Sequence, residues 1–488
     1  MQRKVSDENG SRIIIDNVFW KFAERILAQL VSFAVSIILA RLLEPDDYGV
    51  VAMVNVFIAL ANVFISSGFP SALIQKKDAD DVDFSSVFAF NMVFSFVLYV
   101  VLFLAAPAIS RFYAMPILSP VIRAMSLQVV IASVKSVQQA YVSRNMMFRK
   151  FFWSTLYGTL LSAVMGVTMA YKGFGVWSLV VQYLTNAAID TAVLWFTVDW
   201  RPRRLFSWSR LRGLVSFGWK ILVEGLSETV TRQVRSLVIG KVYTSSDLGF
   251  YTTGDRMPGL VVDNIATSIS AVLFPAMSKI QDNMGEVKEM MRKAVRVTSF
   301  VVFPMLTGLG VVAKPLVSVV LTDKWLGCVP YLRVFCFTQA ATVGMIARHQ
   351  ALNATGRSDV FMIEHMFYRG AVLVILFCVY RISIMAIAWS VVAGSVIMTG
   401  TVMYTSKQFN GYGYREQIRD IVPMLGGCVV MGVPVYFVQK MGLNDGLTLA
   451  IQIILGVAVY TVYSVILGLP EFRFLREYIC GFFRKKGE

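Results

Sequence analysis

The sequence has little of the charge that a water-soluble protein of its length needs. Only 16% of its 488 residues are charged, whereas soluble domains carry about 25% because their surface faces water. Hydrophobic residues make up 56% of the chain, and its mean hydropathy is +0.63. This composition excludes a string of ordinary soluble domains and indicates that most of the outer surface faces lipid.

The chain also lacks the motifs that carry catalysis. Its two histidines, His349 and His365, are too few for a histidine-based metal cluster, and its five cysteines contain no CxxC pair. There is no GxxxxGK[ST] phosphate loop and no HExxH helix. No loop is longer than roughly 20 residues, which is too short for a catalytic domain. We therefore expect a protein that is not an enzyme, holds no metal or cofactor, and functions within its membrane helices.

Long apolar runs dominate what is present. A spanning helix needs about 20 mostly apolar residues, and fourteen segments fit that description. The first, seventh, eighth, tenth and eleventh carry charges, so a hydropathy window alone would report about twelve. The predicted segments are residues 14–40, 48–71, 85–111, 117–142, 152–171, 175–198, 214–240, 250–277, 294–320, 328–354, 360–381, 384–405, 418–438 and 446–469.

The basic residues alternate along the loops. The chain has 46 Lys and Arg against 30 Asp and Glu, a net charge of +16. Every second loop carries several cations, as in Arg201, Arg203 and Arg204, and the loops between carry about one each, as in Lys172. The positive-inside rule then places both termini in the cytoplasm and requires an even number of spans. Because this alternation accounts for the basic residues, we expect no nucleic-acid partner.

Two halves of the sequence repeat each other. Arg41-Leu-Leu-Glu-Pro-Asp-Asp-Tyr-Gly49 aligns with Lys241-Val-Tyr-Thr-Ser-Ser-Asp-Leu-Gly249, an offset of 200 residues, and later Pro107 matches Pro315. Parallel repeats of six helices are a known transporter plan, with the substrate site between the halves. We predict an N-terminal six-helix lobe (residues 1–205), a second six-helix lobe (206–412), two additional transmembrane helices (413–470) and a basic cytoplasmic tail (471–488).

Charged stripes run along the first helix of each repeat. On the seventh predicted segment five charged residues fall within an arc of about 120° at 100° per residue. The residues of this stripe are Lys220, Glu224, Glu228, Arg232 and Arg235, and Lys21, Glu24 and Arg25 form a similar stripe on the first segment. Charges at membrane depth are costly, so we interpret the stripes as the lining of a water-filled cavity. Alternatively, the lysines extend to the interface and Glu24–Arg25 and Glu228–Arg232 are structural ion pairs that hold helices together.

Other polar residues lie within apolar segments. Asp255 and Asp263 are eight residues apart, near one helix face, and fit either ion or proton coupling or plain hydrogen bonding. Arg348 and His349 lie near an inside helix end, where anchoring at the interface is the favoured role. Further candidates of this class are Lys135, Asp190, Glu364, His365 and Arg369.

Several short motifs, in a specific order, resemble a known family. They are Trp20…Glu24-Arg25…Gln29…Leu39–Gly49, Ala72-Leu-Ile-Gln-Lys-Lys-Asp78, Val272-Leu-Phe-Pro-Ala-Met-Ser278 and Leu352-Asn-Ala-Thr-Gly-Arg357. Together they span residues 20–357 of the chain. The sequence resembles the polysaccharide-exporter branch, of the Wzx-type, colanic-acid-exporter kind, of the multidrug/oligosaccharidyl-lipid/polysaccharide (MOP) flippase superfamily.

This resemblance implies a V-shaped, alternating-access pair of helix bundles in the bacterial inner membrane. It implies a flippase that moves an undecaprenyl-diphosphate-linked oligosaccharide to the periplasmic leaflet, driven by a proton or sodium gradient. Membrane lipids, a polysaccharide polymerase and a chain-length regulator are the other implied partners. The diphosphate would lie near Lys21, Arg25, Lys220, Arg232 and Arg235. Cavity tuning or coupling is assigned to Glu24, Glu224, Glu228, Asp255 and Asp263.

Three other functions compete with this prediction. A cation-coupled multidrug exporter of the same superfamily normally has twelve helices and an acidic cavity, so the basic stripes and the two additional helices argue against it. A membrane polymerase or ligase of polysaccharide assembly usually has a large periplasmic catalytic loop, which this chain lacks. A scaffold without transport activity would leave the charged stripes without a purpose.

Overall fold

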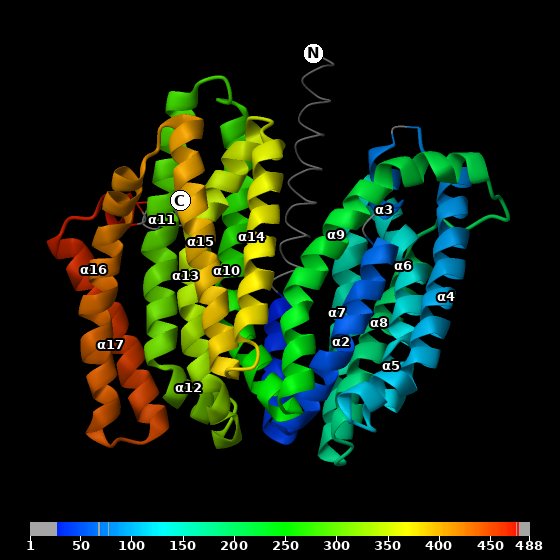
Figure 1. The fold of residues 1–488 in the computed structure, drawn as a ribbon, viewed down its shortest axis with the longest axis horizontal. Coiled ribbons are helices and arrows are strands. Elements are labelled where there is room, and N and C mark those ends of the chain that lie inside the picture. Colours follow the sequence, from blue (N-terminus) through cyan, green and yellow to red (C-terminus); the bar gives the residue numbers. More distant parts are fainter. Residues whose placement is uncertain (1–26, 67–68, 77, 475, 478–488) are drawn as a thin grey trace, which may run out of the picture. The chain divides into compact units, whose positions relative to one another are not determined.

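The computed structural model describes residues 27–66, 69–76, 78–474 and 476–477, and these residues form helices joined by short connections (Figure 1). Twelve helices in this part of the chain are long and apolar enough to cross a membrane. Two further helices have counterparts among the predicted spans: the shorter Leu27–Leu42 and the charged α9 (Trp208–Val242). The protein is therefore an all-α polytopic membrane protein, as predicted.

The helices up to residue 249 and those beyond it belong to two compact units, residues 1–249 and 250–488, called the first and second unit below. The first contains α2 (Pro45–Ser66), α3 (Phe69–Gln75), α4 (Asp81–Tyr113), α5 (Leu118–Met125), α6 (Leu127–Arg144), α7 (Phe148–Tyr171), α8 (Val176–Thr197) and α9. Helix α10 (Ser245–Ser278) begins in the first unit. The second contains the rest of α10, then α11 (Met284–Val311), α12 (Ala313–Val320), η1 (Asp323–Cys328), α13 (Val329–Ala354), α14 (Ser358–Val379), α15 (Ile384–Asn410), α16 (Tyr414–Val438), η2 (Gln439–Met441) and α17 (Asp445–Ile466). The predicted lobe boundary after residue 205 stays a prediction about the sequence repeat.

The ninth predicted span, residues 294–320, was wrong in its bounds. Helix α11 begins ten residues earlier, where the Asn283 side chain accepts hydrogen bonds from the backbone N–H groups of Gly285 and Glu286. The helix ends at Val311, and the short α12 follows. Pro315 lies in the first turn of α12, where its missing N–H group is tolerated; inside a continuous helix it would leave the Val311 carbonyl without its partner. The position of Pro315 fits the break, whereas α4 continues through the matching Pro107.

The sequence repeat is visible in how α2 and α10 begin. In α2 the Asp47 carboxylate accepts a hydrogen bond from the backbone N–H of Glu44, at 3.1 Å. In α10 the Asp247 carboxylate accepts one from the backbone N–H of Thr244, at 3.2 Å. Each aspartate accepts a hydrogen bond from a backbone N–H group at the start of a helix. Its negative charge also interacts favourably with the positive end of the helix dipole. The matched motifs thus encode the same local structure twice.

The two additional helices pack against α11 and α12 within the second unit, with α16 and α17 at one edge of that bundle (Figure 1). The Tyr460 hydroxyl of α17 donates a hydrogen bond to the Phe300 carbonyl of α11, at 3.1 Å. Three basic residues spaced four apart on α11 form ion pairs with acidic residues that follow α15. The pairs are Lys288–Glu416 at 2.8 Å, Arg292–Asp420 at 2.8 Å and Arg296–Glu471 at 2.6 Å. These ion pairs fix the additional helices to the bundle.

Candidate functional site

The stripe predicted on the seventh span lies on α9, a helix of 35 residues in the first unit. Lys220 is part of α9, but its side chain lies outside the described part of the structure. Glu224, Glu228 and Arg232 are exposed on the surface of the first unit. Charged side chains at mid-helix in a lipid-facing position would be untenable, so this exposure fits a face that contacts water.

Glu228 and Arg232 form an ion pair of 2.8 Å, one helical turn apart, and their side chains are 55% and 72% exposed. Because both residues belong to α9, the pair does not tie two helices together. An exposed pair at this spacing stabilises a helix by only about 0.3–0.5 kcal/mol. The structural role considered for this pair is therefore weak, and the charges are available to a ligand.

Arg235 lies one turn further along α9. Its Nη1 atom is enclosed, and no hydrogen-bond partner for that atom is found within the described residues. An enclosed N–H donor without an acceptor is costly, and a guanidinium matches the geometry of phosphate oxygens. Arg235 therefore carries a donor atom that no described residue satisfies, on the same helix face as Glu228 and Arg232.

The other predicted site residues are distributed elsewhere. Asp255 and Asp263 are exposed on the part of α10 that belongs to the second unit. Lys21, Glu24 and Arg25 lie outside the described residues, so their placement as cavity residues stays a prediction.

Two membrane-embedded ion pairs occupy helix interfaces. Lys135 of α6 and Asp190 of α8 are joined at 2.8 Å in the first unit. Arg348 of α13 and Glu364 of α14 are joined at 2.8 and 3.1 Å in the second unit, and both are almost fully buried. The Thr405 hydroxyl of α15 also donates to Glu364. The expectation that Arg348 anchors at the interface was wrong, because its exposed fraction is 1%.

A cavity of about 110 Å³ lies beside Arg348, enclosed by α11, α13, α15 and α16. Its lining is mainly apolar, with polar groups from Thr399, Ser406, Tyr412 and Gln417. A cavity of this size has room for about three waters at 30 Å³ each. Arg348 Nε has no hydrogen-bond partner within the described residues, so such waters would satisfy it.

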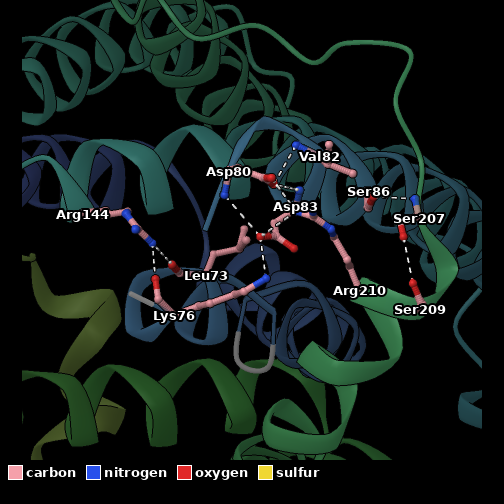
Figure 2. A network of polar contacts seen from close by, with 10 residues as sticks. All are labelled: Leu73, Lys76, Asp80, Val82, Asp83, Ser86, Arg144, Ser207, Ser209 and Arg210. Carbon is pink, nitrogen blue, oxygen red and sulfur yellow. Dashed lines mark hydrogen bonds and ion pairs between the residues drawn. The ribbon is translucent and has the colours of Figure 1, made fainter. Parts of the chain in front are cut away.

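A polar network holds the beginning of α9 in place (Figure 2). The side chain of Asp80 caps α4 by accepting from the N–H groups of Val82 and Asp83. Asp83 is fully buried and pairs with Lys76 at 2.7 Å. Arg210, in the first turn of α9, reaches both carboxylates, at 2.5 Å from Asp80 and 3.7 Å from Asp83. The stripe-bearing helix is therefore anchored to the start of α4.

Two further contacts complete this anchor. The backbone N–H of Ser207, the residue before α9, donates to the Ser86 hydroxyl at 2.9 Å. Arg144, at the end of α6, donates to the carbonyls of Leu73 and Lys76 around the end of α3 (Figure 2). Lys76, Arg144 and Arg210 are basic residues of the kind that, in the sequence alone, indicate membrane topology and no ion-pair partner. The acidic cluster from Asp80 to Asp83 before an apolar run was the capping signal that could have revealed the network.

The network also changes the pKa of one of its carboxyl groups. Hydrogen bonding to Arg210, followed by hydrogen bonding to the Asp83 backbone, lowers the pKa of the Asp80 carboxyl below its ordinary value. Asp80 is therefore ionised throughout the neutral range, and the ion pair with Arg210 persists there.

Residues 38–330 match a protein family described as "Polysaccharide biosynthesis protein". The match covers more than half of the chain. The chain belongs to this family. This family assignment agrees with the resemblance to polysaccharide exporters that the sequence motifs indicate.

Curated relatives agree with this assignment. The chain is 23% identical over 485 residues to the succinoglycan biosynthesis transport protein ExoT of Rhizobium meliloti, covering 96% of this chain and 95% of that protein. It is 24% identical over 301 residues to the lipopolysaccharide biosynthesis protein WzxC of Escherichia coli, covering 61% of each. It is 23% identical over 336 residues to the teichuronic acid biosynthesis protein TuaB of Bacillus subtilis, covering 68% and 69%.

Solved structures share the fold. The lipid II flippase MurJ in an inward closed conformation superposes with a TM-score of 0.76 at 14% identity, covering 95% of this chain and all of that one. An inward-facing multidrug transporter of the MATE family gives a TM-score of 0.59 at 13% identity, covering 82% and 96%. The fold is therefore that of the MOP superfamily.

Proposed function

We propose that this protein is a flippase for an undecaprenyl-diphosphate-linked oligosaccharide repeat unit. It moves the unit from the cytoplasmic to the periplasmic leaflet of the bacterial inner membrane. The product supplies the synthesis of a surface polysaccharide such as an exopolysaccharide, a capsule or an O-antigen.

The observation that carries this proposal is family membership over residues 38–330, together with full-length similarity to a protein named for transport in succinoglycan biosynthesis. The relatives named above are named for the biosynthesis of three different polysaccharides. What they have in common is therefore a step of polysaccharide synthesis and not a particular sugar. We infer that the sugar meets the membrane as a lipid-linked repeat unit, whose diphosphate a cationic site can recognise whatever the sugar is.

The α9 stripe suits this task. A polar headgroup has to cross about 30 Å of hydrocarbon, and a wet, charged face removes much of that cost. Arg232 and Arg235 offer guanidinium groups for phosphate oxygens, and Lys220 offers a point charge. Glu224 and Glu228 lie beside them and would limit how tightly an anion is held. Release after transport needs such a limit, since uniform tight binding would stall the cycle.

The cycle is alternating access driven by an ion gradient, with protons or sodium as the coupling ion. Besides Glu224 and Glu228, the exposed carboxylates Asp255 and Asp263 are the coupling candidates. Both termini lie in the cytoplasm according to the loop charges. A polysaccharide polymerase and a chain-length regulator are the proposed partners downstream.

A gene deletion tests this function. We expect the deletion strain to lose surface polysaccharide and to accumulate the lipid-linked repeat unit, and the intact gene to restore both. Growth of the same strains with cationic drugs tests the alternative, a multidrug exporter. Unchanged polysaccharide together with increased drug sensitivity would replace the proposed function by drug export.

A further inference from the structure

An open cavity of about 470 Å³ lies between the first turns of α7 and the end of α8 in the first unit. This volume is within the range of ligand sites. The residues that line it are Met147, Arg149, Lys150, Trp153, Tyr157, Val193 and Thr197. None of them belongs to the predicted substrate stripe, so the cavity needs an explanation of its own.

Two cations stand at the mouth of this cavity. Arg149 is exposed, and the Lys150 ammonium is fixed by donation to the Thr197 carbonyl at the end of α8. The nearest acidic side chain that pairs with Lys150 is Asp199, at 3.8 Å, and that side chain is fully exposed, so it screens the ammonium weakly. The cavity is therefore electropositive at the loop end of the helices, where it would attract an anion.

One helical turn further into α7 the lining becomes aromatic. Trp153 and Tyr157 stack with ring centroids 5.7 Å apart and remain 37% and 47% exposed. Tryptophan and tyrosine in this position are typical of the membrane–water interface, where one side of the ring is apolar and the other meets polar groups. The cavity thus lies at headgroup depth.

Beyond the aromatic pair the same helix continues as an apolar track. Leu160, Leu161 and Val164 are 44%, 46% and 62% exposed. From Lys150 to Val164 the helix rises by about 21 Å at 1.5 Å per residue. Charge, aromatic rings and aliphatic side chains therefore follow one another along α7 in the order of the phosphate, glycerol and acyl chain of a phospholipid.

We propose that this cavity binds the headgroup of an anionic glycerophospholipid, with its phosphate at Arg149 and Lys150 and an acyl chain along α7. A free phosphate ion would use only the two cations and would leave the aromatic pair and the apolar track without a role. The bound lipid is a fixed part of the first unit and not the transported substrate. The site is independent of the proposed function, because its ligand is a constituent of the membrane itself.

Bromine quenching of tryptophan fluorescence tests this site directly. The full-length protein is placed in nanodiscs of phosphatidylcholine that contain a minor share of brominated phosphatidylglycerol or, separately, of brominated phosphatidylcholine. The contribution of Trp153 is the difference between the wild type and Trp153→Phe. We expect the brominated anionic lipid to occupy the site about tenfold more readily than its neutral counterpart, since each cation near the surface favours anionic lipid.

Arg149→Gln alone should lower this preference, and Arg149→Gln combined with Lys150→Gln should reduce it to near one. Arg204→Gln, which removes an exposed cation outside the cavity, should leave it intact. Equal quenching by both lipids in the wild type, or a preference that survives the double substitution, would overturn the proposal. Displacement by inorganic phosphate would also overturn it, because it would show a site for the free ion. No oligosaccharide is present, so a failure here leaves the proposed function standing.

Discussion

The backbone oxygen of Ser245 lies where a side chain on Gly49 would have to be. A Cβ atom built on Gly49 would approach that oxygen to 1.8 Å, and reciprocally a Cβ on Gly249 would approach the Pro45 oxygen to 2.1 Å. These four residues match in pairs at an offset of 200, so the repeated motif packs against its own copy. Glycine at both positions permits the first turns of α2 and α10 to touch backbone to backbone.

We expect Gly49→Ala and Gly249→Ala each to lower the amount of folded protein severely. No real Cβ approaches a carbonyl oxygen at these distances, and the atom in the way is backbone, which has no rotamer to relieve the clash. Gly213→Ala on α9 is the matched control, because a Cβ there meets no atom within 4 Å. Membrane abundance and thermal unfolding in detergent provide the comparison. A wild-type transition in either Gly49→Ala or Gly249→Ala would contradict the close approach.

The Arg348–Glu364 pair leads to a prediction about stability. Removing either partner alone leaves an uncompensated buried charge and should lower the free energy of unfolding by about 3–5 kcal/mol. Replacing both with leucine should recover most of that loss, because the desolvation of both charges disappears together. Unfolding of Arg348→Leu, Glu364→Leu and the double variant measures this. If the double variant is as unstable as the less stable single variant, the two charged groups stabilise the fold through contacts other than the one between them.

The Arg292–Asp420 pair attaches α16, the first of the two additional helices, to α11. Its two hydrogen bonds, at 2.8 and 2.9 Å, should make Arg292→Ala cost about 2 kcal/mol. The swap of Arg292→Asp with Asp420→Arg should restore part of the loss, while each reversed residue alone should be worse than alanine. Protease sensitivity of the connection between α15 and α16 reports on detachment. Equal sensitivity in the wild type and all four variants would show that apolar packing alone holds these helices.

The Asp80–Arg210 contact should behave simply with pH. A carboxyl whose folded pKa is lowered contributes stability above its unfolded value of about 3.9 and loses it as the pH falls through the folded value. The difference in unfolding temperature between the wild type and Asp80→Asn should therefore be constant from about pH 5 to 8 and shrink only below about pH 4. Asparagine still caps a helix, so the cap is preserved. Asp199→Asn, at a fully exposed position, is the control. A difference that changes near pH 7 would contradict the lowered pKa.

Much of this fold follows from local signals in the sequence. The apolar runs and the alternating loop charges locate the helices, and the Asp47 and Asp247 motifs locate two matched helix starts. The stripe on α9 also follows, because a helix has a fixed period and five charges on one face are unmistakable.

Other features depend on residues distant in the sequence. The burial of Arg348 depends on Glu364 and Thr405 from two other helices, which periodicity within one helix does not reveal. The anchoring of α9 through Arg210 depends on Asp80 and Asp83, 130 and 127 residues earlier in the numbering. Basic loop residues serve topology in general, so their ion-pair partners are decided only by the folded arrangement.

Reconstitution tests the central claim most directly. The purified protein is inserted into liposomes that contain undecaprenyl-diphosphate-linked oligosaccharide in both leaflets, and an added glycosidase trims only what faces outward. With a proton or sodium gradient, the wild type should allow nearly all of the oligosaccharide to be trimmed. Arg235→Ala should leave about half protected, as in protein-free liposomes, and Tyr171→Ala, an exposed position at the far end of α7, should match the wild type. Complete trimming with Arg235→Ala would show that Arg235 of the α9 stripe is not needed for transport. If half of the oligosaccharide stays protected with the wild type under both gradients, the proposal that the protein is a flippase is contradicted.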